Sequence, residues 1–139
     1  MSAKTANFTT VELGAFAEVE YGDNDRPKKF LKDTLALTGM EISVTTIPAG
    51  GKSPFFHSHK QNEELYIFIQ GSGQMQLDDN LVDVKEGTLI KVLPASKRAI
   101  RASADAQLVY LCIQAKENSL EQYTKGDGII NNDVDWINN

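Results

Sequence analysis

Two histidines stand two residues apart in this sequence, and a pair of carboxylates follows them. His57 and His59 are the only histidines of the chain, and Glu63 and Glu64 come shortly after. Imidazole is the commonest metal ligand among protein side chains. Residues two apart on an extended chain point to the same side, so both imidazoles can reach one point, and only one of the two glutamates can join them. The pattern predicts a centre for a divalent metal.

Short apolar runs separated by Gly, Pro, Asn and Asp predict the elements that must position these groups. Runs of this length and spacing are typical of an all-β sandwich, jelly roll or barrel. The strands that we expect are Val11–Glu20, Met40–Ile47, Glu64–Gln70, Gln74–Leu77, Leu81–Lys85, Thr88–Leu93, Ala99–Ala102 and Gln107–Gln114. One short helical segment is expected over Arg26–Leu35, with Asp25 as its N-cap and Pro27 in its first turn.

The expected strand Glu64–Gln70 has large side chains on both of its faces. Glu64, Tyr66, Phe68 and Gln70 share one face, and Leu65, Ile67 and Ile69 share the other. A strand with one face in water would show a polar face, so this strand must be covered on both sides. The barrel interior covers one side, and a second sheet, the N-terminal segment or another subunit covers the other. We therefore expect a homodimer.

The composition excludes several classes of protein. The chain has 139 residues, of which 41% are hydrophobic and 24% are charged, as in an ordinary globular domain. A net charge of −5 disfavours general binding to nucleic acid or to an anionic membrane. The apolar runs are too short to span a bilayer, and no signal peptide is evident. The single cysteine, Cys112, is expected to be a buried apolar residue. We expect a soluble cytoplasmic protein.

The stretch from Gly51 to Gly71 resembles the first motif of the cupin superfamily. That motif reads Gly, five residues, His-x-His, three or four residues, Glu, six residues, Gly. The matching positions are Gly51, His57, His59, Glu64 and Gly71, and counting back from Gly71 selects Glu64 over Glu63. The resemblance implies an all-β cupin jelly roll, or double-stranded β-helix, with the metal in its interior. The barrel would span residues 40–115, with an N-terminal extension (1–39) packed on it and a C-terminal tail (116–139).

The second cupin motif is degenerate in this chain. It reads Gly, five residues, Pro-x-Gly, two residues, His, three residues, Asn. Here six residues separate Gly87 from Pro94, Ser96 replaces a glycine, and the histidine is missing. Counted from Gly87, the histidine position is Arg98; counted from Pro94, it is Ala99. Neither side chain ligates a metal, since a guanidinium only donates hydrogen bonds.

Three ligands remain, and they leave the metal and the function open. Two imidazoles and one carboxylate suit Fe(II) and also catalytic Zn, while Mn and Ni are compatible with the same set. An inward Arg98 would bind a carboxylate or phosphate of a substrate, and Tyr66, on the face of Glu64, would line the pocket. The resemblance implies a small-molecule-binding protein, either a metal-dependent enzyme or a ligand-binding or sensing module with a lost or weakened metal site. A sugar-nucleotide epimerase-like cupin would need a further histidine as its base, and a DNA-binding regulator would need a helix-turn-helix pattern.

Overall fold

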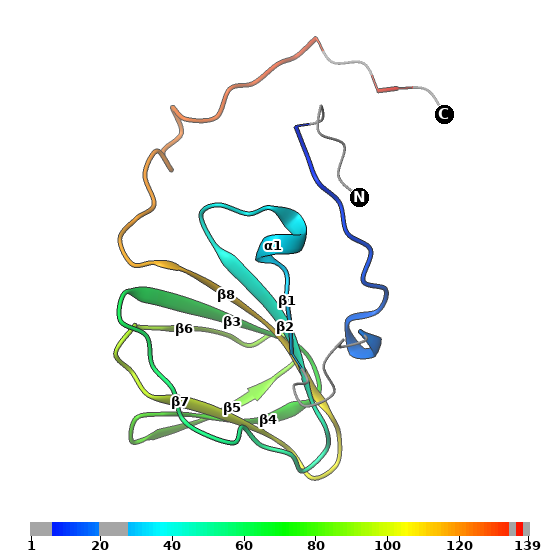
Figure 1. Ribbon diagram of the computed structural model, residues 1–139, viewed down its shortest axis with the longest axis vertical. Helices are drawn as coiled ribbons and strands as arrows, with labels where there is room; N and C mark the ends of the chain where they lie inside the picture. Colours follow the sequence, from blue (N-terminus) through cyan, green and yellow to red (C-terminus); the bar gives the residue numbers. More distant parts are fainter. Residues whose placement is uncertain (1–6, 20–27, 134–135, 138–139) are drawn as a thin grey trace.

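The computed structural model describes residues 7–19, 28–133 and 136–137, and it consists mainly of antiparallel strands in two facing sheets (Figure 1). One sheet has the strand order β1-β2-β8-β3-β6 and the other the order β5-β4-β7. The strands are β1 (Lys28–Phe30), β2 (Glu41–Ile47), β3 (Asn62–Gln70), β4 (Ser72–Leu77), β5 (Asn80–Lys85), β6 (Leu89–Val92), β7 (Arg98–Ala102) and β8 (Leu108–Lys116). The all-β prediction is confirmed. Among the described residues, no helix is long and apolar enough to cross a membrane.

The hydrophobic core lies between the two sheets. Phe68 from β3 and Tyr110 from β8 pack with Met75 from β4 and Ile100 from β7, and all four side chains are buried. The rings of Phe68 and Tyr110 lie 5.4 Å apart between centroids. Alternation along β3 thus turns the face of Glu64 inward, as the sequence predicts. The core therefore fills the barrel interior and surrounds the face that carries the candidate ligand.

The end of β3 departs from this alternation. The pairing of β3 with β8 shifts register between Phe68 and Gln70, so an extra residue stands on β3 at this point. Gln70 is exposed, whereas we predicted that it would share the inward face of Phe68. The bulge explains why simple alternation fails at this end of the strand.

The N-terminal segment covers part of the outer face of the larger sheet, but not as a strand. Our prediction of a strand over Val11–Glu20 is wrong for the described residues, which form only a short 3-10 helix, η1 (Phe16–Glu18). Gly14 has a φ of 77°, which interrupts an extended run. The cover consists of side chains: Leu13, Ala17 and Val19 pack against Val44, Val109, Ile69 and Leu111.

The predicted helix over Arg26–Leu35 is also wrong in its first half. Lys28–Phe30 forms β1, which pairs antiparallel with β2, so backbone pairing with the edge of the sheet overrides the local helix signal. Asp25 and Pro27, the expected cap and first turn, lie outside the described residues. Only the four-residue helix α1 (Lys32–Leu35) remains of the prediction.

Helix α1 begins differently from the expectation but ends at the expected residue, Leu35. The Glu41 Oε1 atom accepts hydrogen bonds from the backbone N–H groups of Leu31 at 3.2 Å and Lys32 at 2.8 Å. The Glu41 carboxylate, from the following strand, therefore caps the free N–H groups at the start of the helix. The C-cap residue, Ala36, has a left-handed φ of 55°.

The segment that follows β2 runs beside β7 and extends the smaller sheet. The Ser53 N–H donates to the Ile100 carbonyl at 2.8 Å, and the His59 N–H donates to the Pro94 carbonyl at 2.7 Å. Between these contacts, His57 pairs with Arg98 in an isolated bridge. The backbone on which both histidines stand is therefore fixed by hydrogen bonds to β7 and to the loop before it.

Candidate functional site

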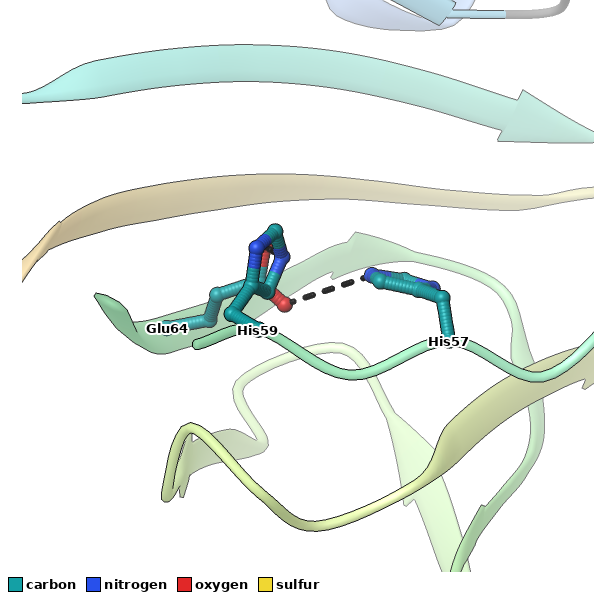
Figure 2. Close-up of side chains that lie close together, drawn as sticks. All are labelled: His57, His59 and Glu64. Atoms are coloured by element: carbon teal, nitrogen blue, oxygen red, sulfur yellow. Dashed lines mark hydrogen bonds and ion pairs between the residues drawn. The ribbon is translucent and has the colours of Figure 1, made fainter. Parts of the chain in front are cut away.

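Three potential metal ligands converge inside the barrel (Figure 2). His57 and His59 come from the extended segment beside β7, and Glu64 comes from β3. Their ligand atoms all lie within 4.8 Å of one another. The Nε2 atom of His59 is 3.1 Å from Glu64 Oε2, and that of His57 is 3.7 Å from Glu64 Oε1. The structure thus brings together the three residues that the sequence singled out, and Glu63 is not part of this group.

Glu64 is buried and strongly hydrogen-bonded. Its Oε1 atom accepts a hydrogen bond from the Tyr66 hydroxyl at 2.6 Å and another from Arg98 Nη1 at 2.6 Å. Burial by itself raises the pKa of Glu64, but the groups of His57, Tyr66 and Arg98 that face the carboxylate outweigh this effect and hold its pKa well below the ordinary value. Glu64 is therefore an ionised carboxylate at neutral pH, with Oε1 committed to two donors and Oε2 facing His59.

The guanidinium of Arg98 is completely buried and points into the barrel. Besides its ion pair with Glu64, it binds three backbone carbonyls of the loop between β6 and β7. Nε donates to Ser96 O at 3.0 Å, and Nη2 donates to Leu93 O at 2.7 Å, Pro94 O at 3.1 Å and Ser96 O at 2.7 Å. The carboxylate with which Arg98 pairs belongs to its own chain, and a direct contact with a substrate remains a prediction.

The structure also decides which residue turns inward at the degenerate second motif. Along β7, Arg98 and Ile100 are buried, whereas Ala99 and Arg101 alternate with them and are more exposed. The inward residue is therefore the one counted from Gly87, and the extra residue of the motif is absorbed near Pro94. Arg98 approaches Glu64 from the strand that follows that loop.

The donor set fits a divalent cation, while the charge nearby opposes one. Two imidazoles and a carboxylate that face one another are ligands that Fe, Mn, Ni and Zn accept. The positive charge of Arg98, 2.6 Å from the same carboxylate, repels a second cation. The geometry therefore favours binding, and the electrostatics reduce its strength.

A cavity of about 600 Å³ reaches the site at His57, the one residue of the three that lines it. Tyr66 and Arg98 also form part of its wall, and their predicted contacts with a substrate stay a prediction. The volume is in the range of small-molecule sites in proteins. Burial and the neighbouring carboxylate of Glu64 raise the pKa of Tyr66, so its hydroxyl stays protonated and acts as a donor.

Sequence reasoning did not place five polar residues of this wall: Lys28, Thr45, Lys52, Ser53 and Tyr110. For Thr45 the available signal was the inward alternation of Ser43, Thr45 and Ile47 along a predicted strand, which places polar groups in the interior. Cys112 is buried, as expected, and its burial and the charge of Glu64 raise the pKa of its thiol.

Comparisons with known proteins agree with this architecture. The sequence profile of the cupin domain matches residues 43–114. The crystal structure of a cupin protein from Bacteroides fragilis superposes with a TM-score of 0.79 at 36% identity, covering 91% of this chain and 98% of that one.

Two further relatives resemble only part of this chain. An uncharacterized protein of Methanocaldococcus jannaschii is 33% identical over 71 residues, which is 51% of this chain and 56% of that protein. The matched stretch thus spans little more than half of the curated relative. A putative sugar phosphate isomerase from Acidithiobacillus ferrooxidans shares the fold, with a TM-score of 0.57 at 24% identity over 64% of this chain and 58% of that one.

Proposed function

We propose that this chain, which belongs to the cupin family, binds a small molecule in its barrel beside a divalent metal held by His57, His59 and Glu64. The observation that carries the proposal is the approach of three ligand atoms within 4.8 Å of one another, with one of the three residues, His57, in the wall of a cavity of about 600 Å³. A metal with three protein ligands keeps open coordination positions and supplies Lewis acidity to a bound substrate. The metal would be Fe, Mn, Ni or Zn.

The residues around Glu64 orient the proposed ligand set. Tyr66 and Arg98 both bind Oε1, and this leaves Oε2 directed at the imidazole of His59. Hydrogen bonds of this kind fix the direction of a ligating carboxylate. We therefore assign Tyr66 and Arg98 to positioning the carboxylate.

Metal analysis tests the proposed site. Protein purified without chelator and without a nickel-affinity tag should contain metal, or take it up when it is offered Fe(II), Mn, Ni or Zn. His57→Ala and His59→Ala should each abolish uptake while circular dichroism shows an intact fold. Glu64→Gln should reduce uptake strongly and Glu63→Gln should not, since Glu63 is outside the ligand group. Full uptake in both histidine variants would overturn the site.

A second candidate function is binding or sensing of a ligand without a metal. The observation that favours it is the ion pair between Arg98 and Glu64, with 2.6 Å between Nη1 and Oε1. The guanidinium neutralises the carboxylate without any added cation, and such charge-assisted pairs are strong when buried. Substoichiometric metal in every preparation, not restored by reloading, would favour this function over the first.

We further propose that the chain forms a homodimer through the outer face of the larger sheet. The N-terminal segment covers Ile69 on this face, while Leu65 and Ile67 remain only half-buried. Leu89 on β6 lies opposite Ile67 of β3, and its side chain is 59% exposed. The tail after β8 extends away from the barrel (Figure 1) and exposes apolar side chains such as Trp136. A second copy would bury both features, as in the apolar interfaces of stable dimers.

A further inference from the structure

The cavity wall carries a row of polar groups that the proposed metal site does not use. Lys28 on β1 lies opposite Thr45 on β2, which lies opposite Tyr110 on β8. All three residues line the cavity. Next to Tyr110 in the sheet is Phe68 on β3. Phe68 is four residues from Glu64, so the backbone positions of these two residues are about 13 Å apart along the strand. A ligand in the cavity therefore meets His57 at one level and this row at another.

Lys28 supplies a positive charge to the row. Its Nζ atom lies 5.6 Å from the centroid of the Phe30 ring, which is on the same face of β1. None of the ion pairs among the described residues involves Lys28. The neighbouring Lys29 lies opposite Val44, whose side chain packs on the outer face of the sheet. Lys28 is thus the inward lysine of β1, and Lys29 is its outward counterpart.

Thr45 supplies an independent observation. Its Oγ1 atom is buried and has no hydrogen-bond partner among the described residues, although the residue is only 4% exposed. A buried hydroxyl without a partner costs free energy, and native structures contain few of them. Thr45 is directly opposite Lys28, so an oxygen atom bound between them would satisfy the hydroxyl and pair with the ammonium group.

Lys52 and Ser53 also line the cavity, and the rest of the wall near this row is mainly apolar. Phe30, Ile47, Phe55 and Ile100 line the same cavity. Aromatic and aliphatic walls of this kind bind apolar bodies, and a few polar groups fix their orientation. The carboxylate of Glu64 is already paired with Arg98, so the negative charge nearest to the cavity is neutralised. The wall therefore combines a lysine that forms no ion pair among the described residues, an unsatisfied hydroxyl and an apolar surface.

We infer that the cavity binds a small carboxylate with an apolar, preferably aromatic, body. The carboxylate group lies between Lys28 and Thr45, the body contacts Phe30 and Ile100, and the far end points toward His57. This inference rests on the proposed function in placing the ligand in the same cavity. The carboxylate subsite itself uses none of the proposed metal ligands, so the two can be tested separately.

A matched pair of probes tests this subsite in the full-length, chelator-treated protein. 3-Phenylpropanoate and 3-phenylpropanamide have the same body and differ in charge, and their dissociation constants can be measured by NMR titration. We expect the carboxylate to bind at least about 10-fold tighter than the amide, because hydrogen bonds to charged groups are stronger than those to neutral groups. Lys28→Met should abolish this preference, and Thr45→Val should weaken it severalfold. Lys29→Met removes the same charge from the opposite face of β1 and should leave the preference unchanged.

The alternative outcomes separate this inference from the metal proposal. Equal affinity for the two probes, absence of binding, or equal effects of Lys28→Met and Lys29→Met would overturn the subsite. Binding of the carboxylate only after metal loading, lost in His57→Ala and kept in Lys28→Met, would place it on the metal and also overturn the subsite. Carboxylate binding that survives His57→Ala and is lost in Lys28→Met supports it. If Lys28→Met does not fold, the probe preference in the wild type and in Thr45→Val decides.

Discussion

His57 and Arg98 lie directly opposite each other in an isolated antiparallel bridge. The His57 N–H donates to the Arg98 carbonyl at 3.1 Å, and the Arg98 N–H donates to the His57 carbonyl at 3.0 Å. Both side chains then approach the same Oε1 atom of Glu64, at 3.7 Å from His57 Nε2 and 2.6 Å from Arg98 Nη1. A proposed metal ligand and a competing cation are thus fixed on one rigid pair of backbone segments, and replacing Arg98 changes their balance.

Replacing Arg98 with histidine should tighten metal binding. The change removes a positive charge next to Glu64 and adds a donor at the inward position of β7, so we expect affinity to rise at least about 10-fold. Arg98→Met, which removes the charge without adding a donor, should give a smaller gain. Competition with a chromophoric chelator measures both.

The matched control for this substitution is Ala99→His. Ala99 lies opposite Gln76 and alternates with the inward residues of β7, so a histidine there should leave metal affinity unchanged. An equal gain in Ala99→His, or no gain in either Arg98 variant, would show that position 98 does not belong to the metal site.

Replacing Glu64 with glutamine should destabilise the chelator-treated protein in a pH-dependent manner. Removing one partner of a buried ion pair leaves Arg98 uncompensated and typically costs about 3–5 kcal/mol of unfolding free energy. The pKa of Glu64 is lower in the folded than in the unfolded chain, so its contribution is fully present above the ordinary glutamate pKa of about 4.3. That contribution declines as the pH falls below this value.

Urea denaturation at pH 7 and near pH 3 checks this prediction. The difference in unfolding free energy between the wild type and Glu64→Gln should be large at pH 7 and smaller at the acid pH. Glu63→Gln, which changes the neighbouring carboxylate outside the ligand group, should have little effect at either pH. A difference that grows on acidification would contradict the sign.

Protonation of Asp78 should disturb the loop between β6 and β7, whose carbonyls bind Arg98. Its Oδ1 atom accepts a hydrogen bond from the Lys97 N–H at 2.9 Å, and its Oδ2 accepts one from the Ser96 hydroxyl at 2.9 Å. These two donors lower the pKa of Asp78. The NMR shift of the Lys97 amide should therefore change with a midpoint below the ordinary aspartate pKa of about 3.9.

Two substitutions identify the origin of that transition. Asp78→Asn should abolish it, and asparagine tolerates the left-handed φ of 54° at this position. Asp79→Asn changes the adjacent carboxylate and should leave the transition in place. A midpoint at or above the ordinary value would show that the carboxylate does not hold the loop.

Light scattering should give twice the mass of one 139-residue chain at micromolar concentration. Leu65→Lys and Ile67→Lys place charges on the proposed interface and should shift the protein toward the monomer. Leu81→Lys is the control, because Leu81 is also exposed but lies on β5 of the other sheet. A monomeric wild type would remove the dimer and leave the N-terminal segment as the cover of this face.

The candidate ligands could be predicted from strand alternation together with the resemblance to the cupin motif. Alternation allowed only one of two adjacent glutamates, the motif spacing from Glu64 to Gly71 selected which one, and that residue faces inward on β3. The same reasoning located most strand limits within two residues. Strong alternation bounded by turn residues is the most reliable local signal in a sequence of this kind.

The missed features depend on contacts between distant segments. Lys28 reached the cavity wall because its segment pairs with the edge of β2, whereas its local sequence resembles the start of a helix. The contacts of Arg98 with three carbonyls depend on the path of a loop whose length departs from the family motif. Neither a strand pairing nor a loop path is encoded in the residue types of the segment itself.

The dual contacts of Arg98 restrict how this protein can change by mutation. One guanidinium balances the charge of Glu64 and also binds the carbonyls of Leu93, Pro94 and Ser96. A single replacement that supplies a fourth metal ligand at position 98 therefore leaves those carbonyls without their donor. Conversion to a four-ligand metal centre needs at least one compensating change in the loop, so the path between the two forms passes through a less stable intermediate. This barrier would tend to preserve an arginine at position 98 once it has appeared.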